Sequence, residues 1–278
     1  MKKALIQSPI APYYLEPKAC TELDDEGWYG HIVNIIEDLG NGWFRIDAPY
    51  RYKTFARGGD MCFDETEIAN YELKANLMRV WKNSADVLDR TDYQGGILKT
   101  LYRGAIVDVL ESTVEVDGEK TGWSKVRLIG GETGFMRRSW LGTYYTSQNG
   151  DEEHFRNAVV ETALSYMGSH YRWGGKSPNG IDCSGLTGAS YMMNGVLIFR
   201  NANIVEGYPI REIPREQMTK GDLLFFKGHV ALYIGDGKYV HSTGRVGDDG
   251  VVINSLNPSD ADYRKDLAEG IEAVGSIF

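Results

Sequence analysis

The stretch "GHVALYIGDGKYVHST", residues 228–243, predicts a β-hairpin near the end of the chain. Apolar residues alternate with polar or small ones on either side of the turn at residues 235–237, which is typical of two antiparallel strands joined by a tight turn. We expect Ile234 to pair with Lys238 across this turn. The hairpin therefore indicates an antiparallel sheet in this part of the chain.

The same register brings two histidines together. Val240 then lies opposite Leu232, and His229 and His241 share the other face of the hairpin. They would be diagonal neighbours, with backbones roughly 7–8 Å apart. A register shifted by one residue would mix apolar and polar side chains, so we prefer the first. Either histidine alone is more often an ordinary surface or core residue, but a pair on one face indicates catalysis when a nucleophile is present.

A candidate nucleophile stands in "GIDCSGL", residues 180–186, where a glycine-rich loop is predicted to become a helix. If the helix begins at Cys183 or Ser184, its unpaired N–H groups and positive dipole end lie beside the sulfur and favour the thiolate. The alternative for a lone cysteine is inert packing in a core. The paired histidines favour the catalytic interpretation.

The last part of the chain, from about residue 148, is predicted to contain two helices followed by strands. Asp151 is a good N-cap for the first helix. One apolar face of that helix is expected to contain Phe155, Val159, Ala163 and Met167. The second helix covers residues 183–195, and residues 222–278 are mostly strand and turn. This order predicts an α+β domain with an antiparallel sheet.

The first half of the chain contains an internal repeat. "GHIVNIIEDLGNGWFRI", residues 30–46, matches "GAIVDVLE" at residues 104–111 followed by "GWSKV" at residues 122–126. Each copy predicts two or three short strands joined by turns. Residues 1 to about 145 are therefore expected to form two small β-barrels, with a join near "IANYELKAN", residues 68–76.

Composition limits the classes of function. The 278 residues carry a formal net charge of −9, which argues against nucleic acid or an anionic membrane as the main partner. The start "MKKALIQSPIAPYY" lacks the apolar core of a signal peptide, so we expect a cytosolic protein. Three cysteines are no disulfide framework, although a bridge between Cys20 and Cys62 stays open.

The second half resembles the NlpC-type papain-like cell-wall peptidases. The resemblance rests on "YRWGG", "DCSGL", "KGDLLFF", "GHVALYIGDG" and "YVHSTG", which follow one another in family order across residues 151–278. It implies that Cys183 is the nucleophile, that His229 is the general base and later the general acid, and that His241 orients His229. The backbone N–H of Cys183 is a candidate donor to the oxyanion.

The first half resembles tandem bacterial SH3 domains. The resemblance predicts SH3-like barrels at residues 1–72 and 73–147, ahead of a catalytic domain at residues 148–278. This combination resembles enzymes that hydrolyse the γ-D-glutamyl–L-diamino acid bond of peptidoglycan peptides. It implies peptides of the type L-Ala-γ-D-Glu-diamino acid as partners, in recycling of wall fragments or in wall turnover.

Further residues are implied as substrate contacts. In these relatives a tyrosine of the first SH3 domain helps to bind the free amine of the substrate, and Tyr52 matches it loosely, with Tyr50 as second choice. A tyrosine at a strand edge with no function is the ordinary alternative. The residues that match the lining of the substrate groove are Tyr171, Trp173, Asp182 and Ser184. Trp173 could instead anchor its loop to the core.

The chain departs from these relatives at "LIFRNA", residues 197–202. They have Arg-Asp where this chain has Arg200 and Asn201, so the acidic ligand of the substrate amine is replaced by an amide. This change puts selection of a free amine in question and leaves the cysteine chemistry unaffected.

Two other classes of function stay open. The chain could be a wall-peptide-binding protein with a degenerate catalytic domain, although intact Cys183, His229 and His241 argue against that. It could also be a papain-like amidase or acyltransferase. We expect no metal and no cofactor, because no ligand cluster is evident and "GGKS" at residues 174–177 lacks the glycine spacing of a phosphate loop.

Overall fold

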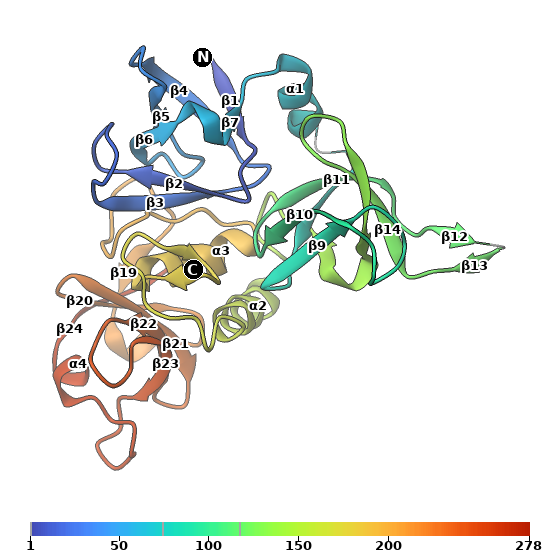
Figure 1. Ribbon diagram of the computed structural model, residues 1–278. Coiled ribbons are helices and arrows are strands. Elements are labelled where there is room, and N and C mark those ends of the chain that lie inside the picture. Colours follow the sequence, from blue (N-terminus) through green and yellow to red (C-terminus); the bar gives the residue numbers. More distant parts are fainter. Residues whose placement is uncertain (1, 74, 117) are drawn as a thin grey trace. The chain divides into compact units, whose positions relative to one another are not determined.

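The computed structural model describes residues 2–73, 75–116 and 118–278, so Lys74 of the predicted join lies outside the described residues. The chain divides into two compact units, Met1–Tyr144 and Tyr145–Phe278. In Figure 1 the first unit runs from blue to green and the second from yellow-green to red. Each unit is described separately below.

The first unit contains two seven-stranded antiparallel sheets. The first sheet consists of β1 (Lys3–Ile6), β2 (Ile10–Tyr14), β3 (Leu23–Trp28), β4 (Ile32–Asp38), β5 (Trp43–Asp47), β6 (Lys53–Arg57) and β7 (Met61–Cys62). The second consists of β8 (Leu77–Val80), β9 (Ser84–Leu88), β10 (Ile97–Tyr102), β11 (Ile106–Glu111), β14 (Trp123–Arg127), β15 (Thr133–Arg137) and β16 (Leu141–Thr143). A single 3₁₀ turn precedes the last strand of each, at Gly58–Asp60 and Arg138–Trp140.

The two sheets have the same topology, which confirms the internal repeat. Their strand orders are β3-β2-β6-β5-β4-β1-β7 and β10-β9-β15-β14-β11-β8-β16. Even a β-bulge recurs, between Ile35 and Glu37 where β4 pairs with β5 and between Val109 and Glu111 where β11 pairs with β14. Among the described residues neither sheet pairs its end strands, so the expected closed barrels are replaced by open sheets.

Side chains that alternate along the strands fill a separate core in each repeat. The first core contains Ala4, Ile6, Ala11, Tyr13, Val33, Ile35, Phe44, Ile46, Ala56 and Met61. The second contains Val80, Ala85, Val87, Leu101, Ala105, Val107, Val109, Val126, Leu128, Met136 and Leu141, together with Tyr29 from the first repeat. One aromatic side chain of the first repeat therefore belongs to the core of the second.

Backbone contacts join the two repeats. The N–H of Ile106 donates to the carbonyl oxygen of Tyr29 over 2.8 Å. Gly30 has a φ of +80°, and a Cβ there would lie 2.4 Å from the Ile106 carbonyl oxygen. At the equivalent position, Gly104 lies so close to the ring of Trp28 that a Cβ would approach it to 2.2 Å. Both glycines allow close approach of the backbones, which explains why they head both copies of the repeat.

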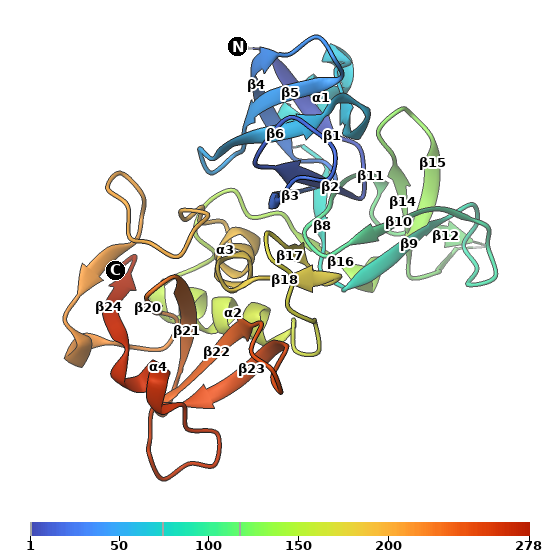
Figure 2. The ribbon, with the colours of Figure 1, turned by 60° about the vertical axis from the view of Figure 1, so that its left-hand side comes forward.

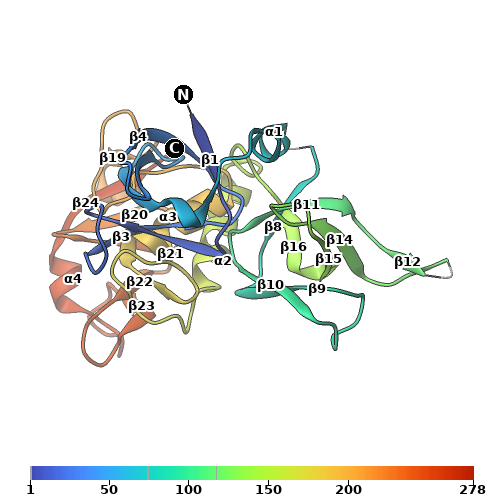
Figure 3. The ribbon, with the colours of Figure 1, turned by 45° about the horizontal axis from the view of Figure 1, so that its top comes forward.

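The predicted join is a helix, α1 (Glu65–Leu73), rather than an irregular connection. Asp64 accepts a hydrogen bond from the N–H of Glu67 as an N-cap does, and Ile68 and Tyr71 are buried. The sequence pattern misses this helix because only two of its side chains face a core. A short hairpin of β12 (Glu115–Val116) and β13 (Glu119–Lys120) extends from the second repeat (Figure 3).

The second unit contains a six-stranded antiparallel sheet in the order β19-β24-β20-β21-β22-β23. Its strands are β19 (Arg211–Ile213), β20 (Leu223–Phe226), β21 (His229–Gly235), β22 (Lys238–Thr243), β23 (Gly250–Ser255) and β24 (Ile271–Ser276). Helices α2 (Glu152–Leu164) and α3 (Cys183–Met193) precede the sheet in the chain, and α3 packs against β21 and β22 (Figure 2). The predicted α+β arrangement of this part is confirmed.

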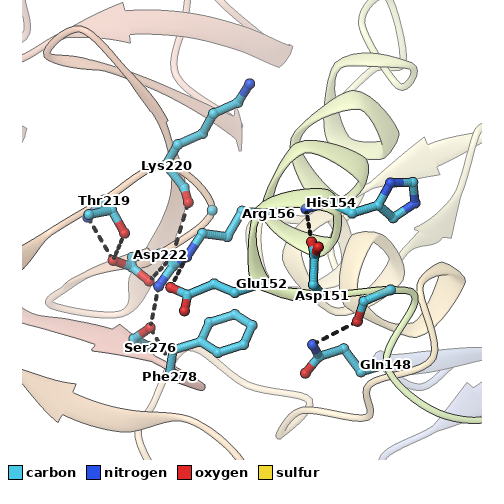
Figure 4. A network of polar contacts seen from close by, with 12 residues as sticks. Gln148, Asp151, Glu152, His154, Arg156, Thr219, Lys220, Asp222, Ser276 and Phe278 are labelled. Carbon is cyan, nitrogen blue, oxygen red and sulfur yellow. Dashed lines mark hydrogen bonds and ion pairs between the residues drawn. The ribbon is translucent and has the colours of Figure 1, made fainter.

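Helix α2 is fixed to the sheet by a polar network (Figure 4). Asp151 caps the helix by accepting from the N–H of His154 over 2.9 Å, as predicted. The Arg156 guanidinium donates over 2.7 Å to Asp222, which is 1% exposed at the start of β20. The N–H of Thr219 donates to the other carboxylate oxygen of Asp222 over 2.8 Å. A buried charge held by several donors fixes the helix in one register on the sheet.

Two details of the predicted second half are wrong. The helix at α2 ends at Leu164, so Met167 lies beyond it and is 45% exposed instead of buried. The segment between the helices, predicted as loop, includes the two-residue strands β17 (Lys176–Ser177) and β18 (Gly180–Ile181). In the part of the chain that the structure describes, no helix has the length and apolar character needed to cross a membrane.

Candidate active site

Cys183 is the first residue of α3, and Asp182 is its N-cap. The Asp182 carboxylate accepts from the N–H of Gly185 over 2.5 Å. The backbone N–H groups of Val230 and Ser184 lie close enough to the Cys183 sulfur to stabilise its anion. The sulfur therefore lies at the junction of the helix N-terminus with the beginning of β21, and its side chain is 7% exposed.

Burial raises the pKa of the Cys183 thiol to about 11, and the charge of Asp182 acts in the same direction. The two N–H donors and the Arg200 guanidinium act in the opposite direction and are outweighed. The expectation that the helix start favours a thiolate is therefore wrong for the resting site. Loss of water around the sulfur destabilises the thiolate more than the helix N-terminus stabilises it.

The two predicted histidines touch. His229 Nε2 lies 2.7 Å from His241 Nδ1, and the ring planes are inclined at 78°. Burial lowers the pKa of His229 to about 3, helped by the positive charge that His241 can carry. Burial also lowers the pKa of His241. Both imidazoles are thus neutral near pH 7 and able to accept a proton.

The predicted hairpin register is right for most of its length. Leu232 pairs with Val240 and Tyr233 with Tyr239, but Lys238 pairs with Gly235, which leaves Ile234 in a bulge. His241 is fully buried and His229 is partly buried, and apolar side chains of the same strands pack with Leu267 of α4 (Lys265–Glu269). This cluster includes Leu224, Phe226, Ala231, Tyr239 and Leu267.

A further polar side chain, that of Asn254, extends the hydrogen-bonded row of His229 and His241. Asn254 on β23 is 7% exposed, and its Oδ1 lies 2.8 Å from His241 Nε2. Its Nδ2 donates to the carbonyl oxygen of Asp262 over 2.9 Å. Sequence analysis missed this residue. The one hint in the sequence is that an amide side chain ends the apolar run "VVIN", residues 251–254, at a position where a buried residue is expected.

Tyr171 lies close enough to Cys183 and Asp182 for their charges to affect it. Burial, together with the charges of Cys183 and Asp182, raises the pKa of the Tyr171 hydroxyl to about 12. Trp173 is 61% exposed, so it does not anchor its loop to the core. The structure thus brings Tyr171 to the cysteine and leaves Trp173 on the surface.

Asp182 and Ser184 belong to a buried charge cluster with Arg200. Arg200 donates to both carboxylate oxygens of Asp182, over 3.2 and 3.0 Å, and to Ser184 Oγ over 2.8 Å. The N–H of Gly174 also donates to Asp182, over 2.9 Å. These side chains hold the loop and the helix start in place, and their predicted role as substrate contacts stays a prediction. No role for Arg200 was predicted from the sequence.

Asn201 lines a small pocket beside α3. The other lining residues are Thr187, Ile198, Phe199, Asn203, Val205, Tyr208, Ile210, Leu223, Phe225 and Val230. Thr187 is one helical turn beyond Cys183, and the backbone N–H of Val230 lies near the sulfur. Most of the lining side chains are apolar.

Tyr52 and Tyr50 belong to the first unit. Tyr52 donates through its hydroxyl to Asp24 over 2.7 Å, and its ring stacks against that of Tyr50 with centroids 6.4 Å apart. Tyr50 is 4% exposed and donates to Asp25. Of the two, Tyr52 is the more accessible.

Cys20, Cys62 and Cys183 all carry free thiols, so the open question of a Cys20–Cys62 bridge is answered: the two do not pair. Within residues 2–73, 75–116 and 118–278, no three or more His, Cys, Asp or Glu side chains lie together in a way that could hold a metal ion.

A buried cysteine stands at a helix N-terminus beside a strand whose first residue, a histidine, is hydrogen-bonded to a second histidine on the next strand, and this arrangement defines the class of papain-like cysteine peptidases. Residues 168–265 match the NlpC/P60 family. Over 275 residues, 99% of both chains, the sequence is 44% identical to dipeptidyl-peptidase 6 of Lysinibacillus sphaericus. The chain belongs to the NlpC/P60 family and is a cysteine peptidase.

Other relatives match parts of the chain or its fold. A γ-D-glutamyl-L-lysine dipeptidyl-peptidase of Bacillus cereus is 36% identical over 126 residues, which cover 42% of this chain and 37% of that protein. A crystal structure of an NlpC/P60 family protein from Bacillus cereus covers 98% of both chains with a TM-score of 0.76 and 21% identity. The fold of the whole chain therefore has a solved counterpart.

Proposed function

We propose that this peptidase hydrolyses the γ-D-glutamyl–L-diamino acid bond of peptidoglycan-derived peptides. The observation that carries the proposal is the buried Cys183 at the start of α3, beside strand β21, whose first residue His229 is hydrogen-bonded to His241 on β22. The names of the Lysinibacillus and Bacillus relatives support an enzyme that removes a dipeptide and acts on a γ-D-glutamyl bond.

The proposed reaction is acyl transfer through a thioester. His229 takes the proton of the Cys183 thiol while the sulfur attacks the γ-carbonyl carbon of D-glutamate. The backbone N–H of Cys183 is positioned to donate to the oxyanion. The imidazolium of His229 then gives its proton to the leaving amine, and the C–N bond breaks. Water, deprotonated by His229, hydrolyses the thioester and restores the thiol.

The pocket lined by Asn201 is the proposed site for the N-terminal residue of the peptide. Its apolar lining suits the methyl group of L-alanine, and the Asn201 amide oxygen can accept from the ammonium group. Tyr52 is the proposed second ligand of that amine. We further propose that Tyr171, Trp173, Asp182 and Ser184 line the groove, with Asp182 and Ser184 acting through the loop that they hold.

The three-domain organisation is also a proposal. It assigns SH3-like domains to residues 1–72 and 73–147 and the catalytic domain to residues 148–278. The shared strand order of the two repeats and the contact of Tyr29 with the second core support two related domains that act as one body. We place the enzyme's action on soluble wall peptides in the cytosol, which cell fractionation would test.

Mass spectrometry of peptide products tests the proposed reaction. Purified protein is incubated with L-Ala-γ-D-Glu-diaminopimelate and with L-Ala-γ-D-Glu-L-Lys, and Cys183→Ala serves as the blank. We expect release of L-Ala-γ-D-Glu from at least one peptide. Intact peptides would point to a binding protein, whereas acyl transfer to an added amine without hydrolysis would support the acyltransferase alternative.

A further inference from the structure

Asn254 has a fixed amide orientation. The carbonyl oxygen of Asp262 can only accept a hydrogen bond, so the atom that faces it over 2.9 Å must be the amide nitrogen. The amide oxygen must then be the atom that faces His241 Nε2 over 2.8 Å. An amide oxygen can only accept, and therefore His241 carries a hydrogen on Nε2.

The hydrogen on His241 Nε2 determines which ring nitrogen of His229 carries a hydrogen. A neutral imidazole with its hydrogen on Nε2 has a bare Nδ1, so His241 can only accept at that atom. The partner there is His229 Nε2, 2.7 Å away, which must therefore be the donor. His229, neutral as well, is left with a bare Nδ1. His229 Nδ1, the nitrogen that does not contact His241, therefore keeps a lone pair that can accept a proton.

We infer that Asn254 is a positioning residue that holds His241 and, through it, His229 in the tautomers that leave His229 Nδ1 as the base. The inference rests on the proposed function. In the attack step the S–H bond of Cys183 breaks and an N–H bond forms at His229 Nδ1, while every other hydrogen of the row stays where it is. No tautomer change is needed before or during proton transfer.

Charged groups around the two rings favour their neutral forms. The Arg264 guanidinium acts on both histidines and lowers the pKa of each, in addition to burial. Asp248 and Asp266 act on His241 in the opposite direction and are outweighed. Tyr239, whose ring lies 5.3 Å from that of His241, and Asp262, whose carbonyl oxygen accepts from Asn254, are further titratable residues beside the pair, and Lys238 of β22 and Lys265 and Glu269 of α4 lie on the elements packed there.

The first test reads the tautomers directly and needs no substrate. Two-bond ¹⁵N–¹H correlation spectra of histidine-labelled protein distinguish Nδ1–H from Nε2–H, and the chain has only five histidines to assign. We expect both His229 and His241 in the Nε2–H form at pH 7. A wild-type His229 in the Nδ1–H form would overturn the inference, whatever peptide the enzyme cuts.

The second test changes the charge at Asn254. In Asn254→Asp the carboxylate stabilises a second proton on His241, which then blocks Nδ1 as an acceptor and moves the His229 hydrogen to Nδ1. We expect the acidic limb of kcat/KM to move upward by about one pH unit or more, with activity recovered at high pH. Asn257→Asp is the matched control, because it adds the same charge on an exposed neighbouring turn, and its acidic limb should stay in place.

A merely structural role for Asn254 predicts something different. It would lower stability in Asn254→Asp and leave the pH profile and the His229 tautomer of the folded fraction unchanged, which would overturn the inference. Asn254→Ala should lower kcat by about tenfold with KM unchanged, because one hydrogen bond that fixes the tautomer is lost. If the peptides above are not cut while the spectra show the expected tautomers, the proposed function fails and the inference stands.

Discussion

The thiol of Cys183 and the imidazole of His229 are both neutral at rest, since burial raises the pKa of one to about 11 and lowers that of the other to about 3. A neutral pair must transfer its proton during the attack on the substrate. His229 is consequently needed in the transition state, and the Cys183 sulfur is protected from solvent oxidants until a substrate reaches it.

The two histidines should differ in how much they contribute. We expect His229→Ala to lower kcat/KM by about 10³-fold or more, because the proton acceptor is gone. His241→Gln should lose only about 10–100-fold, because its amide oxygen can still accept from His229 Nε2. Steady-state kinetics on one peptide compare the two. Near wild-type activity in His229→Ala would contradict the assigned roles.

Asn201 should weaken the preference for a free amine. The neutral amide oxygen of Asn201 accepts a weaker hydrogen bond from the ammonium group than a negatively charged carboxylate would. The difference is on the order of 1 kcal/mol. Asn201→Asp should therefore raise the ratio of kcat/KM for free over N-acetylated peptide several-fold, mostly through KM. The same ratio in Asn201→Ala is the control. No change in Asn201→Asp would mean that this position does not face the amine.

The positions of the reactive side chains were predictable because local patterns encode them. Cys183 follows a cap residue, and the hairpin alternation brings His229 and His241 to one face. Asn254 and Arg200 were not predictable. Their partners lie 13 and 18 residues away in sequence, and those contacts depend on how β23 and the 198–210 segment pack.

At the scale of elements, α3 differs from an ordinary surface helix. It is buried on nearly every side, and its N-cap is the Asp182 carboxylate, which also pairs with Arg200. The helix start, the loop at Gly174 and the 198–210 segment are thus tied to one carboxylate. The position of the Cys183 sulfur depends on that cluster.

Removing Arg200 should destabilise this cluster strongly. Arg200→Met leaves the buried Asp182 charge without its cation, and loss of one member of a buried pair costs about 3–5 kcal/mol. Urea denaturation should show that loss, and Arg200→Met combined with Asp182→Asn should recover part of it. The control Arg245→Met removes an exposed ion pair and should change the free energy of unfolding by less than about 1 kcal/mol. Equal stability of Arg200→Met and the wild type would contradict this interpretation.

Elements were predicted well where periodicity is strong and poorly where tertiary contacts decide. The hairpin and both helix starts follow from alternation and capping. The bulge at Ile234 and the end of α2 before Met167 do not, because turn geometry and packing set them. Helix α1 was missed since only Ile68 and Tyr71 face a core.

At the scale of the molecule, the repeats of the first unit share a core residue. Tyr29 lies in the second core, and its carbonyl oxygen accepts from Ile106. A deletion of residues 1–72 would therefore expose the second repeat as well as remove Tyr52. Substitution of single residues is the better way to ask what the first repeat contributes to specificity.

The whole chain should lose stability in acid. The folded-state pKa of His229 is about 3, below its ordinary value of 6.5, and that of His241 is also lowered. Between about pH 6.5 and pH 3 the unfolded chain binds more protons, so the free energy of unfolding falls as the pH falls through this window. Urea denaturation at pH 7 and pH 4.5 measures the loss. His241→Gln should show a smaller loss, and an identical one would mean that this histidine pair does not control it.

The central claim is that Cys183 attacks the peptide, and turnover by cysteine variants tests it most directly. Release of L-Ala-γ-D-Glu is followed for Cys183→Ala, Cys20→Ala and Cys62→Ala, with circular dichroism to establish folding. We predict that Cys183→Ala folds and loses at least ~10³-fold in kcat/KM, while the other two variants keep their activity. Turnover near the wild-type rate in folded Cys183→Ala would contradict the claim.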